Sequence, residues 1–115
     1  MKILIVEDEI FTAMHLEEAF QELGCTVIGI APNTETAIEL AKEGPEIAIV
    51  DLNLRDGFTG PKIARELAAR YGTKVYYLTG NPGDVGEPFD GLLGVKSKPW
   101  APEDLYEIVD RARSA

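Results

Sequence analysis

The chain has 115 residues, of which 45% are apolar, and a formal net charge of −9 from 20 acidic and 11 basic residues. This length and composition suit one compact domain with its own hydrophobic core, and they argue against a disordered or low-complexity chain. Because lysine and arginine form no basic stripe, we do not expect this chain to bind nucleic acid.

The apolar run at the start of the chain is too short for a signal peptide or a membrane span, so we expect a cytoplasmic protein that does not contact the membrane. Cys25 is the single cysteine, which excludes a disulfide within the chain. It follows Gly24, and we expect it to act as a small apolar residue.

Five short runs rich in Ile, Val, Leu and Tyr predict β-strands. They are Lys2–Val6, Thr26–Ile30, Glu46–Leu52, Lys74–Thr79 and Leu92–Lys96. The runs are continuously apolar, which is typical of parallel strands that are covered on both faces.

Apolar residues at helical spacing predict helices over residues 13–23, 37–41, 61–71 and 102–112. Asn33 or Thr34 is the expected cap of the second helix, and Pro61 and Pro102 open the last two. Gly24 and Gly72 are the expected ends of the first and third helices. Strands alternating with helices indicate an α/β sandwich with a parallel sheet and right-handed crossovers.

One helix of the alternation is missing after Thr79. The 15 residues from Gly80 to Gly94 contain five glycines and two prolines, and each glycine opposes a helix by about 1 kcal/mol and each proline by about 3 kcal/mol. We expect at most one short turn there, around Asp84 to Phe89.

Acidic residues follow two of the predicted strands, and ligands of open α/β sheets bind beyond the carboxyl ends of strands. The first strand ends in Glu7, Asp8 and Glu9, and the third ends near Asp51. If these strands are neighbours, as in the sheet order 2-1-3-4-5, then Glu7, Asp8 and Asp51 converge on one site. Three carboxylates repel one another, and a hard Mg²⁺ ion with oxygen ligands would relieve the repulsion.

A hydroxyl and an ammonium group stand at the ends of the predicted fourth and fifth strands. Thr79 ends the fourth strand, and Lys98 follows the fifth, where its charge suits phosphate oxygens. A carboxylate nucleophile, a metal, a hydroxyl and a lysine suffice to bind and neutralise a transferring phosphoryl group. Each residue alone has a plainer structural explanation, such as a helix cap for Glu9, but their joint placement at four strand ends favours phosphoryl chemistry.

The chain resembles the receiver domain of two-component response regulators from Lys2 to about Ala112. The matching motifs, in order, are ILIVEDE, IAIVDLNLRDGFTG, YLTG and KSKPW. The resemblance implies one receiver domain over residues 1–115 with a flavodoxin-like (βα)5 fold, a five-stranded parallel sheet in the order 2-1-3-4-5 and a degenerate fourth helix. The Thr-Gly pair and that helix are similar to those of atypical stand-alone receivers of alphaproteobacteria.

Residue by residue, the resemblance implies that Asp51 is the phosphoacceptor. Glu7 and Asp8 match the acids that bind Mg²⁺ together with Asp51, and the backbone carbonyl of Asn53 completes the metal shell. Thr79 matches the hydroxyl that turns toward the phosphate, and Lys98 matches the lysine of the family motif. Glu7 replaces the more common aspartate.

Further positions bear on the lifetime of the phosphorylated state and on how the signal is passed to a partner. Asn53 and Asn81 match the residues that border the path of the hydrolytic water, and neither is an obvious general base. Val95 stands where the family usually has an aromatic ring that moves with the threonine. The usual coupling between threonine and ring therefore cannot operate, and we expect a mobile segment from Asn81 to Gly94 that becomes ordered on phosphorylation or partner binding.

The expected function is that of a bacterial signalling domain and not an enzyme, apart from its own phosphorylation and dephosphorylation. A sensor histidine kinase or a histidine phosphotransfer protein would be the phosphate donor. Since the sequence ends with the last helix, we expect output by contact with a downstream protein or by passing phosphate on. The alternative is a pseudo-receiver, an interaction module not switched by phosphate; an aspartyl phosphatase would need a second acid at Asn53. His15 and Trp100 are expected to be a surface residue and a packing residue, respectively.

Overall fold

Five parallel strands form one sheet in the order β2-β1-β3-β4-β5 in the computed structural model, which describes residues 1–115. The strands are β1 (Lys2–Val6), β2 (Thr26–Ala31), β3 (Ile47–Val50), β4 (Lys74–Thr79) and β5 (Leu92–Ser97). The helices are α1 (Ile10–Glu22), α2 (Thr34–Ala41), α3 (Gly60–Tyr71) and α4 (Pro102–Ser114), with one 3₁₀ turn, η1 (Pro82–Asp84). The predicted α/β class, strand order and flavodoxin-like architecture are confirmed.

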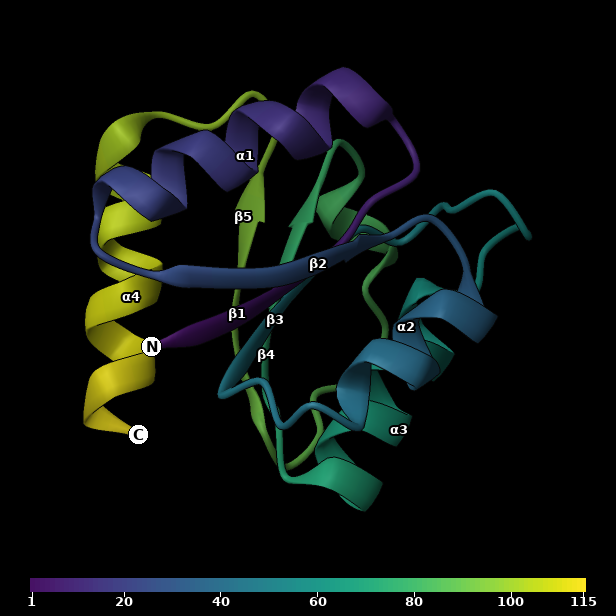
Figure 1. Ribbon diagram of the computed structural model, residues 1–115. Helices are drawn as coiled ribbons and strands as arrows, with labels where there is room; N and C mark the ends of the chain where they lie inside the picture. The colour runs from purple at the N-terminus through teal and green to yellow at the C-terminus, as the bar shows by residue number, and fades with distance from the viewer.

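The helices form a layer on each face of the sheet, with α1 and α4 on one side and α2 and α3 on the other (Figure 1). Alternate residues of β1 show why both layers are needed. Ile3 and Ile5 pack into the core under α1 and α4, whereas Leu4 and Val6 pack into the core under α2 and α3. The continuous apolar strands of the sequence are therefore buried on both faces.

Capping groups set the helix boundaries. The Asn33 side chain caps α2 by accepting a hydrogen bond of 2.9 Å from the Thr36 amide, and Glu9 caps α1 by accepting one of 3.1 Å from the Phe11 amide. Gly72 ends α3 with φ of 67°, in the left-handed region that glycine adopts without a steric cost. None of the four helices is both long enough and apolar enough to span a membrane.

Three strands differ from the prediction, and β3 differs at both ends because it begins at Ile47 and not at Glu46. We predicted β3 over Glu46–Leu52, but the strand ends at Val50 because the Leu52 amide donates its hydrogen bond of 2.8 Å to the Asp51 carboxylate. The strands β2 and β5 each extend one residue further than predicted, to Ala31 and Ser97.

The fourth helix is reduced to η1, which confirms the prediction of no more than a short turn. The turn lies at Pro82–Asp84 and not at Asp84–Phe89 as predicted. Proline has the backbone angle that the first position of a turn needs, whereas Gly86 has φ of 73°, which a right-handed turn cannot include. Val85 and Phe89 instead pack their side chains against the core under α2 and α3.

Candidate functional site

Four residues that are far apart in the sequence meet at the carboxyl edge of the sheet. The Lys98 ammonium, after β5, donates a hydrogen bond of 2.8 Å to Asp51 Oδ2, after β3. It also donates one to Glu7 Oε1, after β1. Thr79 ends β4, between β3 and β5 in the sheet. The predicted convergence of strand ends therefore brings one ammonium group between two carboxylates.

Backbone hydrogen bonds beyond the strands hold these residues in place. The Asp51 amide donates to the Val6 carbonyl at 2.9 Å, and the Lys98 amide donates to the Thr79 carbonyl at 2.9 Å. The Glu7 amide donates to the Ala31 carbonyl, also at 2.9 Å. Because these bonds continue the sheet ladder, the side chains sit on rigid backbone and not on free loops.

Burial dominates the electrostatics of Glu7, whose side chain is 3% exposed. Burial raises the pKa of the Glu7 carboxyl, and hydrogen bonds from Lys98 and from the Glu9 amide offset only part of that rise. Burial alone would lower the pKa of Lys98, but hydrogen bonds to Asp51 and Glu7 outweigh it and raise that pKa. Lys98 is therefore a firmly charged group that neutralises one of two neighbouring carboxylates.

The Thr79 hydroxyl has a free proton. Thr79 is fully buried, and its Oγ1 accepts a hydrogen bond of 3.0 Å from the Asn81 amide. No acceptor takes the hydroxyl proton, so the group can donate to an oxygen that arrives beside Asp51.

The oxygen donors near Asp51 fit a hard cation in their chemistry. The Asp8 carboxylate is partly exposed and accepts no hydrogen bond, and the Asn53 carbonyl accepts none from the backbone, so both keep free lone pairs. The predicted cluster of three carboxylates, Glu7, Asp8 and Asp51, is not found, because no three His, Cys, Asp or Glu side chains lie close enough together to hold a metal by themselves. Glu7 instead contacts the Lys98 ammonium, which also contacts Asp51. Carboxylate, carbonyl and water oxygens are the ligands that Mg²⁺ takes, usually with one or two carboxylates.

Asp56, in the loop after Asp51, and Gly60, the first residue of α3, were missed by the sequence analysis. The Gly60 amide donates to the Leu52 carbonyl at 3.0 Å, which closes the loop onto the backbone of Asp51. Asp56 accepts a hydrogen bond of 2.6 Å from the Thr59 hydroxyl and one of 3.0 Å from the Thr34 amide. These bonds lower the pKa of Asp56 to about 2 and tie the loop to the start of α2.

Tyr77 occupies the strand position opposite Val95, where the parallel register of β4 and β5 pairs the two residues. Its ring meets the edge of the Phe89 ring at a centroid distance of 6.4 Å. The Tyr77 hydroxyl is buried without any hydrogen-bond partner. An aromatic side chain thus lies beside the position where Val95 lacks one, on the neighbouring strand.

The predictions for His15, Trp100 and Cys25 are confirmed. His15 is exposed on α1, and its ring lies 4.6 Å from the half-buried ring of Trp100, which packs against the core under α1 and α4. The peptide bond between Lys98 and Pro99 is cis. Cys25 is buried, as expected of a small apolar residue.

Comparison with known proteins decides the family. A model of the response regulator receiver domain matches residues 3–110. The chain belongs to this family. Receiver domains are signalling modules of two-component systems and not conventional enzymes, so the comparison confirms the resemblance on which the residue roles were predicted.

Individual relatives agree with this placement. The chain is 30% identical over 118 residues to the phyllosphere-induced regulator PhyR of Methylorubrum extorquens, covering 96% of this chain and 43% of that protein. The solution structure of the PhyR receiver domain of Erythrobacter litoralis superposes with a TM-score of 0.84 at 28% identity, over 97% of this chain and 88% of that one. A CheY-like receiver domain of Methylobacillus flagellatus has the same fold, with a TM-score of 0.85 at 23% identity over 97% and 98% of the two chains. The receiver spans about half the length of the curated relatives it matches.

Proposed function

We propose that this receiver domain is phosphorylated on Asp51 by a sensor histidine kinase or a histidine phosphotransfer protein. The observation that carries the proposal is the position of the Lys98 ammonium, which donates hydrogen bonds to both Asp51 and Glu7 at the carboxyl edge of the sheet. A phosphoryl group that reaches Asp51 would meet this fixed cation without any rearrangement of the backbone.

The proposed reaction moves a phosphoryl group from a histidine nitrogen to a carboxylate oxygen. An Asp51 oxygen attacks phosphorus as the bond between phosphorus and the donor imidazole breaks, which leaves an acyl phosphate on Asp51 and a histidine that takes up a proton. Lys98 exchanges a carboxylate partner for a phosphoryl oxygen, and the Thr79 hydroxyl donates its free proton to another.

Glu7, Asp8, Asp51 and the Asn53 carbonyl are the proposed ligands of Mg²⁺. A bound Mg²⁺ ion would neutralise negative charge on the phosphoryl oxygens. Glu7 is turned inward to Lys98, so we expect its longer side chain to contact the ion through water.

Exposed apolar side chains near the site suit a protein donor. Ile10, Phe11 and Met14 of α1 are each more than half exposed, as is Phe58 in the loop after Asp51. All four belong to the two segments that directly follow the site acids. Apolar side chains ringed by charge are typical of a protein interface, and we assign this surface to the phosphate donor.

Loss of the phosphoryl group is proposed to proceed by attack of water on phosphorus. Asn53 and Asn81 are both exposed and border the expected path of that water. An amide is a poor general base, so the side chains can position water but not activate it. We expect hydrolysis without a partner protein.

The output step is proposed to use the segment Asn81–Gly94 and a downstream protein. Between Gly80 and Gly91, only Val85, Phe89 and Gly91 are partly buried, and the Arg65 side chain donates one hydrogen bond of 2.9 Å to the Glu87 carbonyl. Residues 81–91, the part of this segment before β5, are held by few side-chain contacts and can rearrange at a low free-energy cost, whereas the last three residues belong to β5 and pair with β4. Amide exchange measured with and without Mg²⁺ and a phosphate mimic tests this step, and equal exchange in both states would refute it.

A pseudo-receiver that binds partners without a phosphate switch is the second candidate. The observation that favours it is Val95, which gives β5 no aromatic ring to move with Thr79. In that case the acidic residues at the strand ends would only stabilise the fold.

One experiment separates the two candidates. The protein is incubated with Mg²⁺ and acetyl phosphate and its intact mass is measured, with Asp51→Asn as the matched control. A single phosphoryl adduct that is absent from the control supports the phosphorylated receiver. The lack of any adduct, together with no Mg²⁺ binding, would favour the pseudo-receiver.

A further inference from the structure

The loop between β3 and α3 contains a closed turn at residues 54–57, directly after Asn53. The Leu54 amide donates a hydrogen bond of 2.8 Å to the Gly57 carbonyl, and the Gly57 amide donates one of 3.0 Å to the Leu54 carbonyl. Leu52 and Leu54, which flank Asn53 in the sequence, are both buried. The Asn53 carbonyl, a proposed ligand of Mg²⁺, is therefore placed by the position of this turn.

Two hydrogen bonds join the 54–57 turn to the connection between β2 and α2. The Arg55 amide donates to the Pro32 carbonyl at 3.0 Å. The Thr34 amide donates to Asp56 Oδ2, also at 3.0 Å. The first bond joins two backbone groups, whereas the second depends on a side chain. Asp56 is therefore the residue whose substitution would release the turn from this connection.

The same connection also holds the acids that follow β1. The Ala31 carbonyl accepts a hydrogen bond of 2.9 Å from the Glu7 amide, and Asp8 is the next residue. Residues 31–34 thus contact both of the segments that supply proposed Mg²⁺ ligands. A shift of the 54–57 turn relative to residues 31–34 would change the spacing between the ligands of the two segments.

Both carboxylate oxygens of Asp56 accept a hydrogen bond. Oδ1 accepts one of 2.6 Å from the Thr59 hydroxyl, and Oδ2 accepts the bond from the Thr34 amide. These bonds lower the pKa of Asp56 to about 2, so at neutral pH the carboxylate is charged and both bonds are charge-assisted. Thr59 directly precedes α3 and Thr34 begins α2, so one carboxylate connects the starts of two helices.

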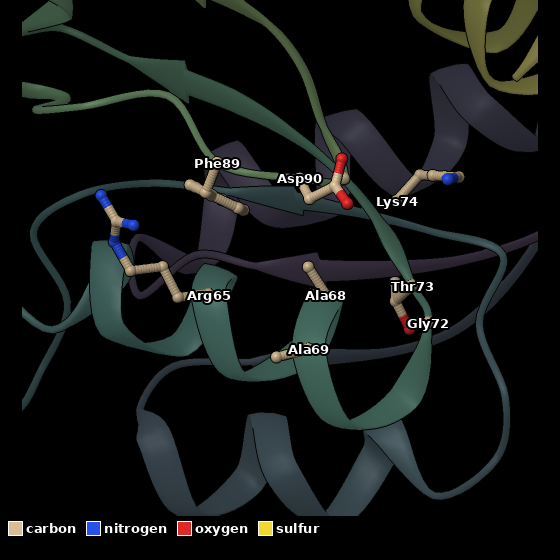
Figure 2. A pocket seen from close by; sticks show the side chains of 9 residues that line it. Arg65, Ala68, Ala69, Gly72, Thr73, Lys74, Phe89 and Asp90 are labelled. Atoms are coloured by element: carbon tan, nitrogen blue, oxygen red, sulfur yellow. The ribbon is translucent and has the colours of Figure 1, made fainter.

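The hydrogen bonds of Asp56 are separate from the groove of about 580 Å³ along α3. Figure 2 shows that groove between α3 and the segment that carries Phe89 and Asp90. Its lining includes no residue of the 54–57 turn and none of residues 31–34. The position of the turn therefore bears on the site at Asp51 and not on the groove.

We propose, on the basis of the function proposed above, that Asp56 is a positioning residue for Mg²⁺, because it fixes the Asn53 carbonyl relative to the acids that follow β1. Mg²⁺ demands near-ideal octahedral geometry, so a small displacement of one ligand weakens its binding. Residues that orient metal ligands without touching the metal typically change metal affinity by roughly 10- to 100-fold when they are substituted.

Thr34 allows a test that changes no charge. It is the first residue of α2, where proline is favoured, and Asn33 before it has ψ of 176°, an extended conformation that suits a residue before proline. Thr34→Pro removes the amide that donates to Asp56, whereas Thr34→Ala shortens the side chain and keeps the amide. In calorimetry we expect Thr34→Pro to bind Mg²⁺ about tenfold more weakly than Thr34→Ala, the lower end of that range, because Asp56 is exposed.

Asp56→Ala tests the same hydrogen bond from the acceptor side. It should weaken Mg²⁺ binding at least as much as Thr34→Pro does. The double variant should bind Mg²⁺ no more weakly than Asp56→Ala alone, because both changes break one bond. Glu39→Ala is the charge control, since it removes an exposed carboxylate of α2 that pairs with Lys42 and not with the loop. Its Mg²⁺ affinity should equal that of the unchanged protein.

A measurement without metal reports the position of the turn directly. Amide exchange at Leu54 and Gly57, whose amides close the turn, should be faster in Thr34→Pro than in Thr34→Ala and should not differ in β1. A purely structural Asp56 would lower the urea midpoint and leave the Mg²⁺ affinity unchanged.

The outcomes separate this role of Asp56 from the proposed function. Equal Mg²⁺ affinities of Thr34→Pro and Thr34→Ala would overturn the role of Asp56 while phosphoryl labelling of Asp51 still supports the proposed function. A loss of affinity in Glu39→Ala as large as that in Asp56→Ala would also overturn it, because charge alone would then explain the effect. An unchanged protein that binds no Mg²⁺ would refute both proposals together.

Discussion

Gly60 lies so close to the backbone of Asp51 that a β-carbon at Gly60 would be 2.1 Å from the Asp51 carbonyl oxygen. Real β-carbons essentially never approach another atom this closely, and a backbone carbonyl cannot rotate away as a flexible side chain can. The first residue of α3 therefore sets how tightly the loop returns to the proposed phosphoacceptor.

Gly60→Ala should destabilise the protein and displace Asp51. Overpacking a close contact typically costs about 1–3 kcal/mol and occasionally more, and we expect about 3 kcal/mol here because the obstacle is backbone. Urea denaturation measures the loss, and acetyl phosphate labelling measures the displacement. Gly83→Ala is the matched control, since a β-carbon there meets no atom within 4 Å. If the two variants were equally stable, the close approach would not exist in solution.

Lys98→Met should increase the affinity for Mg²⁺ while it slows phosphorylation. The ammonium group neutralises Glu7 and Asp51, and a cation competes with it for the same oxygens. A unit charge about 4 Å away is worth several kcal/mol at an effective dielectric constant near 20, and solvent reduces this at a partly exposed side chain. We expect binding of Mg²⁺ to tighten by roughly tenfold, measured by calorimetry or by Trp100 fluorescence.

The control for the Lys98 variant is Lys96→Met, which removes an ammonium group from the neighbouring end of β5. Lys96 pairs with Glu107 and Asp104 of α4 and not with the site acids. Its variant should leave Mg²⁺ affinity unchanged. Equal effects of the two substitutions would mean that the carboxylates at Lys98 are not metal ligands.

Glu7→Gln should become more stable relative to the unchanged protein as pH rises. Burial raises the pKa of Glu7 above its ordinary value of 4.5, so the folded protein holds this proton more tightly than the unfolded chain does. The stability that this proton supplies is fully present below 4.5 and is lost as pH rises through the folded pKa. A glutamine side chain has no proton to lose in this pH range, so its contribution to the free energy of unfolding does not change with pH.

Denaturant midpoints of both proteins between about pH 4 and about pH 8 give the measurement. Glu22→Gln serves as the control because Glu22 is exposed and its side chain accepts no hydrogen bond. A stability difference for Glu7→Gln that stays constant over this pH range would show that Glu7 does not titrate differently in the folded protein.

The sheet could be predicted from the sequence, because the patterns that indicate its strands are local and the strand order follows from the topology. The continuous apolar runs and the glycine at the end of α3 predict the elements, and parallel strands then bring their carboxyl ends to one edge. Asp51 and Lys98, 47 residues apart, can be placed together by this reasoning from the strand ends alone. The end of β3 could not be predicted, because it depends on whether the Leu52 amide donates its hydrogen bond to the neighbouring strand or to the Asp51 carboxylate.

Other features depend on distances that no sequence pattern reports. The inward turn of Glu7 toward Lys98 is a rotamer choice, and the ties from Asp56 to Thr34 and Thr59 span up to 22 residues. The sequence contains one weak indication of the role of Gly60. Glycine just before Pro61 is a poor first residue for a helix, so its presence suggests that a side chain would not fit there. The register that places Tyr77 beside Val95 follows only once β4 and β5 are paired.

Tyr77→Phe should leave the protein equally stable or stabilise it by about 1 kcal/mol. A buried hydroxyl without a partner costs about 1–3 kcal/mol, and phenylalanine keeps the ring that packs against Phe89 while it removes that cost. Tyr76→Phe is the neighbouring control, because the Tyr76 hydroxyl is not buried without a partner and its loss should be neutral or slightly unfavourable. Thermal and urea denaturation of both variants give the comparison. If Tyr77→Phe instead lowered the free energy of unfolding by more than about 1 kcal/mol, the hydroxyl would have a hydrogen-bond partner in solution.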